Sequence, residues 1–311
     1  MIQPSLHLKS HKQWSGIWTA LITPFKKSTV GLFIDGESLG SLIEAQIKGG
    51  ISGLVIAGST GEGSLLSTEL YESLLVEAKR VVGNRIPLVA GLGIGGTESC
   101  LKNLSLARQW GYDGVLASPP AYIKAPQRGL KEHFLRLAKE GLPVCLYEIP
   151  GRAVSSIEIS TLKELSDCDL AHAKNLVSIK DATANMQRAL DTKRACGDRF
   201  AMMSGDDGTF ASFMSSGGDG VISVVSHLLP RSMRKIFDLS QSGKTKEAVA
   251  EQNRINPLVE ALFWESNPVP VKSVLAKLGL IKEAIFCEPL CGMEELKLEK
   301  LVSLARKIGD A

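Results

Sequence analysis

Residues 176–196 read LVSIKDATANMQRALDTKRAC, and this stretch contains the unit from which the fold is built. The continuous apolar run Leu176–Ile179 predicts a strand that is covered on both of its faces. The following segment, Met186–Cys196, has the length and spacing of a helix. A buried strand followed by a helix is the repeating unit of parallel α/β folds.

The same unit recurs along most of the chain. The predicted strands are Gly16–Leu21, Gly53–Ala57, Pro87–Ala90, Gly114–Ala117, Pro143–Tyr147, Leu176–Ile179, Ala201–Ser204 and Gly220–Ser223. The predicted helices between them are Ser38–Lys48, Ser67–Val82, Thr97–Trp110, Gln127–Glu140, Ile157–Ser166, Met186–Cys196 and Asp207–Ser215. Eight such units predict an α/β fold of the (β/α)₈ TIM barrel type, whereas five or six would predict an open doubly wound sheet.

The strand pattern ends near residue 230. Four helical patterns follow it, over Pro230–Ser242, Lys244–Glu265, Val269–Leu278 and Met293–Lys307. We therefore predict an N-terminal extension (1–15), a barrel catalytic domain (16–230) and a small C-terminal helical domain (231–311). No long Pro, Gly or Ser linker precedes the last part, so we expect it to pack directly on the barrel.

Composition and charge limit the possible partners. The chain has 311 residues, 44% of them hydrophobic and 22% charged, which is ordinary for a soluble globular protein. The formal charge of +3 is spread along the chain, which argues against nucleic acid as a partner. No apolar run approaches the roughly 18 residues that span a bilayer, and the N-terminus lacks the apolar stretch of a signal peptide. We expect a cytoplasmic protein without a membrane or nucleic acid partner.

The cysteines and histidines do not predict a metal site. Cys287 and Cys291 are four residues apart, but no histidine or second cysteine pair follows them to complete a zinc site. The remaining residues of these types are scattered, at Cys100, Cys145, Cys168, Cys196, His7, His11, His133, His172 and His227. Reduced thiols and an enzyme without a metal are the expectation.

Active sites of such barrels form where the strands end, and four features lie there. Lys180 follows the run 176–179, and burial at a barrel mouth favours the free amine that attacks a carbonyl. Tyr147, one strand away, is suited to move protons. The turn Gly58–Gly61 offers backbone N–H and hydroxyl donors for a carboxylate, and Arg152 suits bidentate carboxylate binding. Taken singly, each has a plainer interpretation: a solvated lysine, a core tyrosine, an ordinary turn and a surface ion pair.

Six motifs in order along nearly the whole chain carry a resemblance to a known superfamily. They are Gly16–Phe25, Gly58–Glu62, Leu146–Arg152, Ile179–Asp181, Gly217–Ser223 and Asn267–Lys272. The chain resembles the pyruvate-dependent class I aldolases, which include the dihydrodipicolinate synthases and the N-acetylneuraminate lyases. The resemblance implies an imine between a lysine and pyruvate, with no metal or organic cofactor.

The resemblance also implies roles for individual residues. Lys180 would form the imine, and Tyr147, Thr60 and Tyr122 would form a proton relay in which Tyr122 reaches into a neighbouring subunit. Ser59 and Thr60 would hold the pyruvate carboxylate. Ile222 would line the pocket, and we place Gly205 among the substrate-binding residues. The shared tyrosine implies a homo-oligomer of at least two subunits, and a dimer of dimers, the homotetramer, is common among relatives.

Arg152 favours one branch of the superfamily. Pro-Gly-Arg at 150–152 resembles the synthases, in which this arginine binds the carboxylate of aspartate semialdehyde on the route to diaminopimelate and lysine. Three departures bear on that assignment. Ser59 replaces the usual synthase threonine, Glu148 replaces an asparagine and so adds a potential negative charge near the imine or the mouth, and Ala121 replaces a tyrosine.

Feedback inhibition by lysine is expected to be weak or absent. In lysine-inhibited synthases the resemblance assigns the effector pocket to an asparagine, a tyrosine and polar or histidine residues. The corresponding positions in this chain are Gly95, Ala121, Thr68, Tyr71 and Ser99.

Three other functions compete with a synthase. A lyase for N-acetylneuraminate or 2-keto-3-deoxy sugar acids is the closest, because Glu148 and Ala121 alter the second-substrate region. The segment Gly91–Gly96 fits G-x-G-x-x-G, the fingerprint of an NAD-binding oxidoreductase, although it follows the third strand rather than the first and lacks the ribose-binding acid. A barrel that binds without catalysis is disfavoured, because five candidate site residues occur together.

Overall fold

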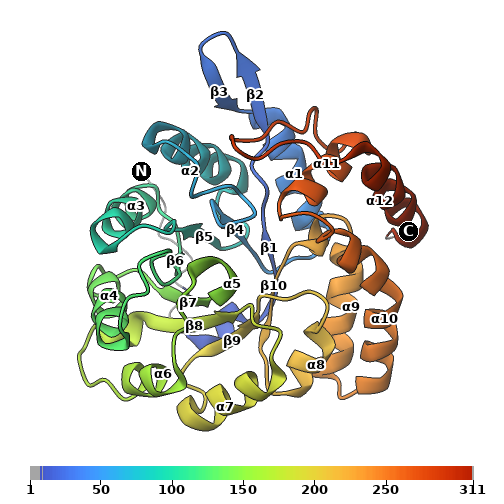
Figure 1. Ribbon diagram of the computed structural model, residues 1–311. Helices are drawn as coiled ribbons and strands as arrows, with labels where there is room; N and C mark the ends of the chain where they lie inside the picture. The colour runs from blue at the N-terminus through green and yellow to red at the C-terminus, as the bar shows by residue number, and fades with distance from the viewer. Residues whose placement is uncertain (1–7, 9, 310–311) are drawn as a thin grey trace.

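The computed structural model describes residue 8 and residues 10–309, and its centre is a closed barrel of eight parallel strands (Figure 1). The order around the barrel is β1, β4, β5, β6, β7, β8, β9 and β10, with β10 paired to β1. The bounds are β1 Gly16–Ala20, β4 Gly53–Ile56, β5 Leu88–Gly91, β6 Gly114–Ala117, β7 Val144–Glu148, β8 Leu176–Asp181, β9 Ala201–Ser204 and β10 Gly220–Ser223. The prediction of a (β/α)₈ barrel is confirmed.

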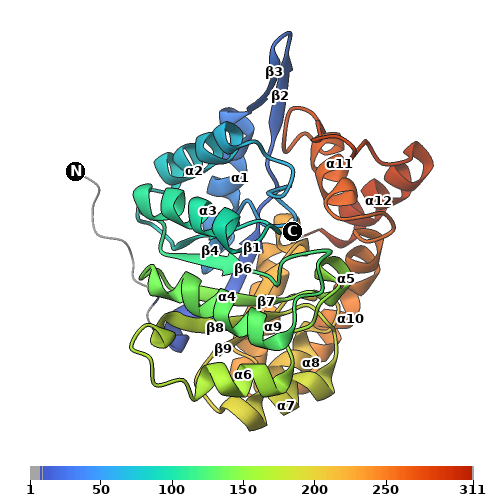
Figure 2. The ribbon, with the colours of Figure 1, turned by 60° about the vertical axis from the view of Figure 1, so that its left-hand side comes forward.

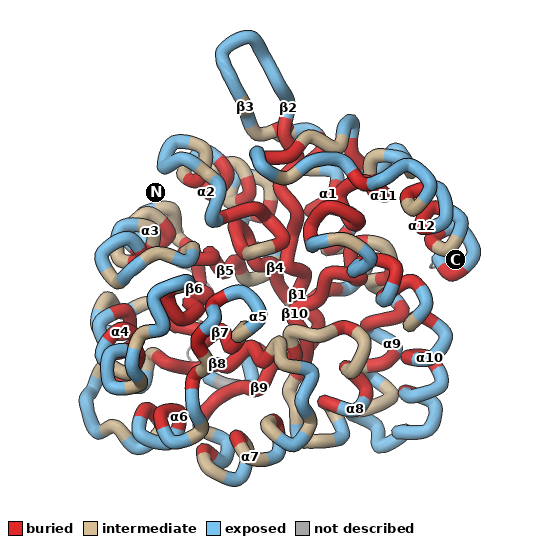
Figure 3. The backbone as a smooth tube through the Cα atoms, in the orientation of Figure 1, coloured by how far each residue is buried: buried red, intermediate tan, exposed pale blue. Residues whose placement is uncertain are grey.

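Helices surround the strands, and the strands themselves are buried (Figure 3). This outer layer consists of α1 Gly36–Lys48, α2 Thr68–Val82, α3 Thr97–Gln109, α4 Gln127–Lys139, α6 Ile159–Ser166, α7 Met186–Cys196, α8 Phe210–Ser215 and α9 Pro230–Gln241. Side chains that accept a hydrogen bond from the first turn begin three of these helices: Asp35 for α1, Ser67 for α2 and Asn185 for α7. The short 3₁₀ helices are η1 His11–Trp14, η2 Ala173–Asn175 and η3 Val225–His227.

A hairpin and a single helical turn, neither predicted from the sequence, also form part of the molecule. A hairpin of β2 Phe25–Ser28 and β3 Gly31–Ile34 projects from the molecule between β1 and α1, and most of it is exposed (Figures 1 and 3). A single helical turn, α5 Pro150–Ala153, follows β7. This turn carries Arg152 and is therefore important for the site.

Three helices follow the barrel and pack against one side of it (Figure 2). They are α10 Thr245–Ala261, α11 Val269–Lys277 and α12 Glu295–Ile308. Helix α9 contacts both β1 and α10, so it joins the barrel to the helices that follow. The division of the chain at residues 15 and 230 stays a prediction. No helix in the described part of the chain has the length and apolar character needed to cross a membrane.

Two stacked tryptophans close the end of the barrel opposite the candidate site. The rings of Trp14 and Trp18 lie 5.1 Å apart at 16°, and both side chains are buried. Trp14 Nε1 donates to the carbonyl oxygen of Leu8 at 3.1 Å, and Trp18 Nε1 donates to that of Trp14 at 2.8 Å. A Cβ at Gly53 would lie 2.4 Å from the Trp18 ring, so this first residue of β4 must be small. Part of the predicted N-terminal extension thus belongs to the barrel core.

Replacing Trp14 with alanine is expected to lower the free energy of unfolding by about 3–5 kcal/mol, because the change removes a large buried side chain and opens a cavity. Chemical denaturation followed by circular dichroism measures this loss. Trp264→Ala is the matched control, because the Trp264 side chain is 42% exposed. If Trp14→Ala lowers the free energy of unfolding by less than about 1 kcal/mol, the closed end of the barrel does not depend on this ring.

Candidate active site

Lys180 and Tyr147 face each other across neighbouring strands at the carboxyl end of the barrel. The register of β7 and β8 pairs Tyr147 with Lys180, and both side chains are buried. Lys180 Nζ lies 4.3 Å from the centroid of the Tyr147 ring. Across residues 10–309, no carboxylate comes within 4.0 Å of Lys180 Nζ, so no ion pair occupies the amine. The amine of Lys180 therefore lies over the ring of Tyr147, and both side chains are largely shielded from solvent.

A cavity of about 570 Å³ opens above Lys180. Its lining comes from the ends of β4, β7, β8, β9 and β10 and from the segment before α11. The lining residues are Ser59, Thr60, Tyr147, Ile149, Gly151, Arg152, Lys180, Ala182, Gly205, Asp206, Val224, Phe263, Trp264, Glu265, Ser266 and Asn267. Six of the predicted site residues are among them: Ser59, Thr60, Tyr147, Arg152, Lys180 and Gly205.

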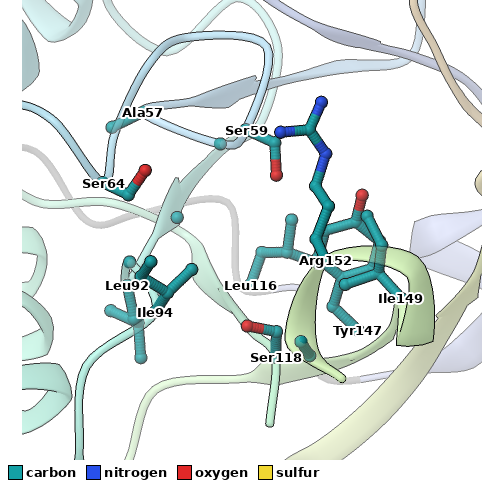
Figure 4. Close-up of a pocket in the computed structure, with 14 residues that line it drawn as sticks. Ala57, Ser59, Ser64, Leu92, Ile94, Leu116, Ser118, Tyr147, Ile149 and Arg152 are labelled. Carbon is teal, nitrogen blue, oxygen red and sulfur yellow. The ribbon is translucent and has the colours of Figure 1, made fainter. Parts of the chain in front are cut away.

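Gly205 brings backbone close to the lysine. A Cβ at this position would lie 3.0 Å from Lys180 Cε and 2.6 Å from the Cβ of Ala182. Any larger residue would therefore displace the lysine side chain. A narrower pocket adjoins the cavity and shares Ser59, Tyr147 and Arg152 with it, and Figure 4 shows these side chains around it.

The turn after β4 is tightly constrained. Thr23 Oγ1 donates to the carbonyl oxygen of Gly61 at 2.7 Å. A Cβ at Gly63 would lie 1.8 Å from the carbonyl oxygen of Ala57, so only glycine fits there. Glu62 has a φ of +58°, in the left-handed region that costs energy for a residue with a side chain. The hydroxyl and backbone groups of Ser59 and Thr60 are thus held at the edge of the cavity.

Asn267 connects this turn to Arg152, and sequence reasoning did not identify that role. Its Nδ2 donates to Thr60 Oγ1 at 2.9 Å. The backbone carbonyl oxygen of Asn267 accepts a hydrogen bond from Arg152 Nη2 at 2.8 Å. In the sequence, Asn267 is the first position of the motif 267–272. No property of Asn267 in the sequence places it at the mouth of a barrel whose strands ended more than 40 residues earlier.

A buried ion pair fixes the same turn from the other side. Lys272 Nζ lies 2.6 Å from Glu62 Oε1, and neither side chain is exposed. The second oxygen of Glu62 accepts a hydrogen bond from the backbone N–H of Cys287 at 2.8 Å. Lys272 Nζ also lies 4.1 Å from the ring centroid of Phe25. Burial lowers the pKa of Lys272, and the carboxylate of Glu62 opposes that shift.

Two predicted site residues lie outside the cavity of their own chain. Tyr122 is 89% exposed, has a φ of +73° and does not line the cavity. Ile222 is buried in the same interior cluster as Tyr147 and is also absent from the lining. Their roles in a proton relay and in the pocket stay predictions.

The expectation for Glu148 needs correction. Its carboxylate does not line the cavity but contacts Ser156, Ile157 and Arg188. Side chains alternate across a strand, so Glu148 faces away from the side on which Tyr147 lies. Burial raises the pKa of Glu148, against the lowering effects of the Ser156 hydroxyl, Arg188 and the Ile157 N–H. Its charge is therefore not at the mouth.

The glycine-rich segment and the cysteine and histidine positions were the other motifs considered for a ligand. Gly91 ends β5 and Gly96 precedes α3, so the glycine-rich segment is a strand-to-helix loop in a closed barrel rather than the crevice of an open sheet. Within residue 8 and residues 10–309, no three His, Cys, Asp or Glu side chains are grouped so that they could hold a metal ion.

Comparison with known proteins identifies the family. The Dihydrodipicolinate synthetase family matches this sequence over residues 13–308. The chain belongs to this family. A curated 4-hydroxy-tetrahydrodipicolinate synthase of Bdellovibrio bacteriovorus is 37% identical over 299 residues, which are 96% of this chain and 99% of the relative.

Solved structures of the dihydrodipicolinate synthetase family agree with this fold. The 4-hydroxy-tetrahydrodipicolinate synthase of Methylacidiphilum fumariolicum superposes with a TM-score of 0.88 at 35% identity, covering 94% of this chain and 96% of the other. The chloride-inhibited dihydrodipicolinate synthase of Acinetobacter baumannii, complexed with pyruvate, gives 0.87 at 34% identity, with coverage of 94% and 98%.

Two of the positions expected to form the effector pocket of lysine-inhibited family members can be described in this chain. Tyr71 is buried, and its hydroxyl donates to the carbonyl oxygen of Gly91 at 3.0 Å. A Cβ at Gly95 would lie 2.9 Å from the Ser99 side chain, so a larger residue does not fit without movement there. The two positions offer neither the histidine nor the asparagine expected to bind lysine.

We therefore expect lysine at millimolar concentration to leave the condensation rate within about twofold of the uninhibited rate, because ligand-binding groups are missing. Initial rates measured at fixed substrates and rising lysine test this. A lysine-sensitive synthase in the same assay is the positive control. Strong inhibition at sub-millimolar lysine would contradict the prediction.

Proposed function

We propose that this chain is a 4-hydroxy-tetrahydrodipicolinate synthase, a class I aldolase-type lyase that condenses pyruvate with L-aspartate 4-semialdehyde. The observation that carries the proposal is the unpaired amine of Lys180, 4.3 Å from the Tyr147 ring centroid in a cavity that also contains Arg152. The curated relatives bear this name, and the structure from Acinetobacter baumannii holds pyruvate.

The first half of the reaction forms an enamine. Lys180 Nζ attacks C2 of pyruvate, whose carboxylate binds to Ser59 and Thr60, and water leaves from the carbinolamine. Tyr147 supplies and removes the protons, with Thr60 and a neighbouring subunit's Tyr122 completing the relay. The protonated imine withdraws electrons, so a methyl proton is lost and an enamine results.

The second half forms the ring. The enamine carbon attacks the aldehyde carbon of the semialdehyde, whose carboxylate is held by Arg152. The amino group of the semialdehyde then attacks the imine carbon, and Lys180 leaves. The products are the cyclic hydroxy acid and one water. The imine is the electron sink, so none of these steps requires a metal or an organic cofactor.

We also propose an oligomeric state and a location for the protein. Tyr122 and the adjacent Ile123 are exposed on the isolated chain, as expected for residues covered by a second subunit in a homodimer or a dimer of dimers. The proposed substrates are metabolites of lysine and diaminopimelate biosynthesis, so we propose a cytoplasmic location.

The sugar-acid lyase has lost one of its two arguments, because the carboxylate of Glu148 does not line the cavity.

An acceptor screen tests the proposal. The protein is mixed with pyruvate and, in separate reactions, with aspartate semialdehyde, N-acetylmannosamine or glyceraldehyde, and pyruvate consumption is followed. We expect kcat/KM for aspartate semialdehyde to exceed that of the other two by at least about 100-fold, because only it matches Arg152 with a carboxylate. Preference for either sugar-like aldehyde would reject the synthase assignment.

A further inference from the structure

Glu148 is a buried carboxylate that the mechanism above does not use. It is the last residue of β7 and follows Tyr147 directly, yet its side chain lies outside the cavity with no exposed surface. A buried carboxylate is costly unless hydrogen bonds or an opposite charge compensate it. The groups that compensate Glu148 therefore indicate what it holds in place.

Two of these groups belong to the chain segment that returns from α5. The hydroxyl of Ser156 donates to Glu148 Oε1. The backbone N–H of Ile157 donates to Glu148 Oε2 at 2.7 Å. Both bonds join the end of β7 to residues eight and nine positions later. The carboxylate thus closes a loop over residues 149–157.

Arg188 completes the attachment from α7. Its Nη2 lies 3.5 Å from Glu148 Oε2 and donates to the carbonyl oxygen of Ile157 at 2.6 Å. Ile157 is therefore held through its N–H by Glu148 and through its C=O by Arg188. Arg188 Nε also lies 3.5 Å from Asp181 Oδ2, and Asp181 is the residue after Lys180.

The loop closed in this way carries Arg152. It leaves β7 at Ile149, forms the single turn α5, and reverses at Val154, which has a φ of +64° and is exposed. One end is fixed covalently to a barrel strand. The other end is held at Ile157 by Glu148 and Arg188, while Gln127 bonds the backbone of Ser156 and Glu158 on either side. Arg152 is itself bonded to the backbone carbonyl oxygen of Asn267, and the loop supplies the backbone from which its side chain reaches that oxygen.

We propose that Glu148 is a positioning residue that fixes the loop 149–157 and thereby aims Arg152 at the carboxylate of the second substrate. This inference rests on the proposed function, in which Arg152 binds the semialdehyde. It assigns Glu148 to the second half of the reaction only. Formation of the imine with pyruvate uses Lys180 and Tyr147, which lie on barrel strands outside the loop.

Steady-state kinetics with both substrates separate this role from a general structural one. The variants are Glu148→Ala, Glu148→Gln and Arg152→Ala, compared with the wild-type protein. For Glu148→Ala we expect KM for aspartate semialdehyde to rise about 10- to 100-fold, as for a misplacement of a binding group by about 1 Å. KM for pyruvate and the rate of borohydride trapping with pyruvate should stay within about twofold of wild type.

Glu148→Gln retains an oxygen that can accept from Ile157 and has nearly the same volume, so we expect an intermediate KM for the semialdehyde. This variant also keeps the test valid if the alanine variant fails to fold. The double variant Glu148→Ala with Arg152→Ala should be little worse than Arg152→Ala alone, because coupled residues are not additive. Additive losses would mean that Glu148 does not act through Arg152.

The outcomes distinguish the two proposals. A wild-type protein that does not use aspartate semialdehyde would overturn both the proposed function and the role of Glu148. An active wild-type protein with an unchanged semialdehyde KM in Glu148→Ala would overturn the positioning role alone. If Glu148→Gln slows borohydride trapping with pyruvate by the same factor as it raises KM for aspartate semialdehyde, the positioning role is also overturned and a general structural role is indicated.

Discussion

Replacing Lys180 with alanine is expected to lower kcat/KM for condensation by roughly 10⁴-fold or more, as for removal of a nucleophile. Lys180 is the one lysine in the cavity lining of the described chain, so no second amine is in place to form the imine. Steady-state rates with pyruvate and aspartate semialdehyde measure the loss. Thermal melting of the variant shows whether the fold is intact.

Lys180→Arg is the matched control for charge. The guanidinium is always protonated and cannot form the imine, so we expect it to be as inactive as the alanine variant. More than about 1% of wild-type kcat/KM in either variant would exclude Lys180 as the nucleophile.

Breaking the buried pair of Glu62 and Lys272 is expected to give the second large effect. Each single change, Glu62→Gln or Lys272→Met, should lower the free energy of unfolding by about 3–5 kcal/mol, because it leaves the partner without compensation in a buried place. Chemical denaturation measures the loss. The exposed pair of Lys282 and Glu37 is the matched control, and Glu37→Gln should change stability little.

The double variant Glu62→Leu with Lys272→Met tests the reason for that effect. Replacing both charges by apolar side chains removes the uncompensated charge, so much of the stability should return. The two single variants and the double variant all lack the ion pair between Glu62 and Lys272 that attaches the turn at Thr60 to α11. We therefore expect all three to have a higher KM for pyruvate than the wild-type protein, even where stability returns. A double variant as unstable as the two single changes combined would show that charge compensation is not the cause.

The barrel was predictable because each strand is a short apolar run that is buried on both faces. The predicted strands at 114–117, 201–204 and 220–223 have the observed bounds. The hairpin of β2 and β3 was missed because Lys26, Lys27 and Ser28 are polar and exposed, so they carry no burial pattern. Helix α5 is one turn long and is too short for a helical period to be visible.

The candidate site was predictable only where it lies on strand ends. Lys180, Tyr147, Thr60 and Arg152 follow apolar runs, and counting strands brings them to one end of the barrel. Asn267 comes from beyond the last strand, and its contacts depend on how α10 and α11 pack. That packing leaves no local pattern in the sequence.

The position of Glu148 could have been predicted. Strand residues alternate between the two faces, so a cavity-facing Tyr147 requires the next side chain to face the helices. The resemblance drew attention to the change from asparagine and not to the face on which it lies. In the structure Glu148, at the end of β7, is bonded to the far end of the loop that carries Arg152.

An imine between Lys180 and pyruvate can be trapped by reduction. Sodium borohydride is added to the protein with and without pyruvate, and the digested peptides are analysed by mass spectrometry. We expect one reduced pyruvate adduct per chain, on Lys180, that requires pyruvate and is missing from Lys180→Arg. No adduct, or an adduct on another lysine such as Lys272, would contradict it.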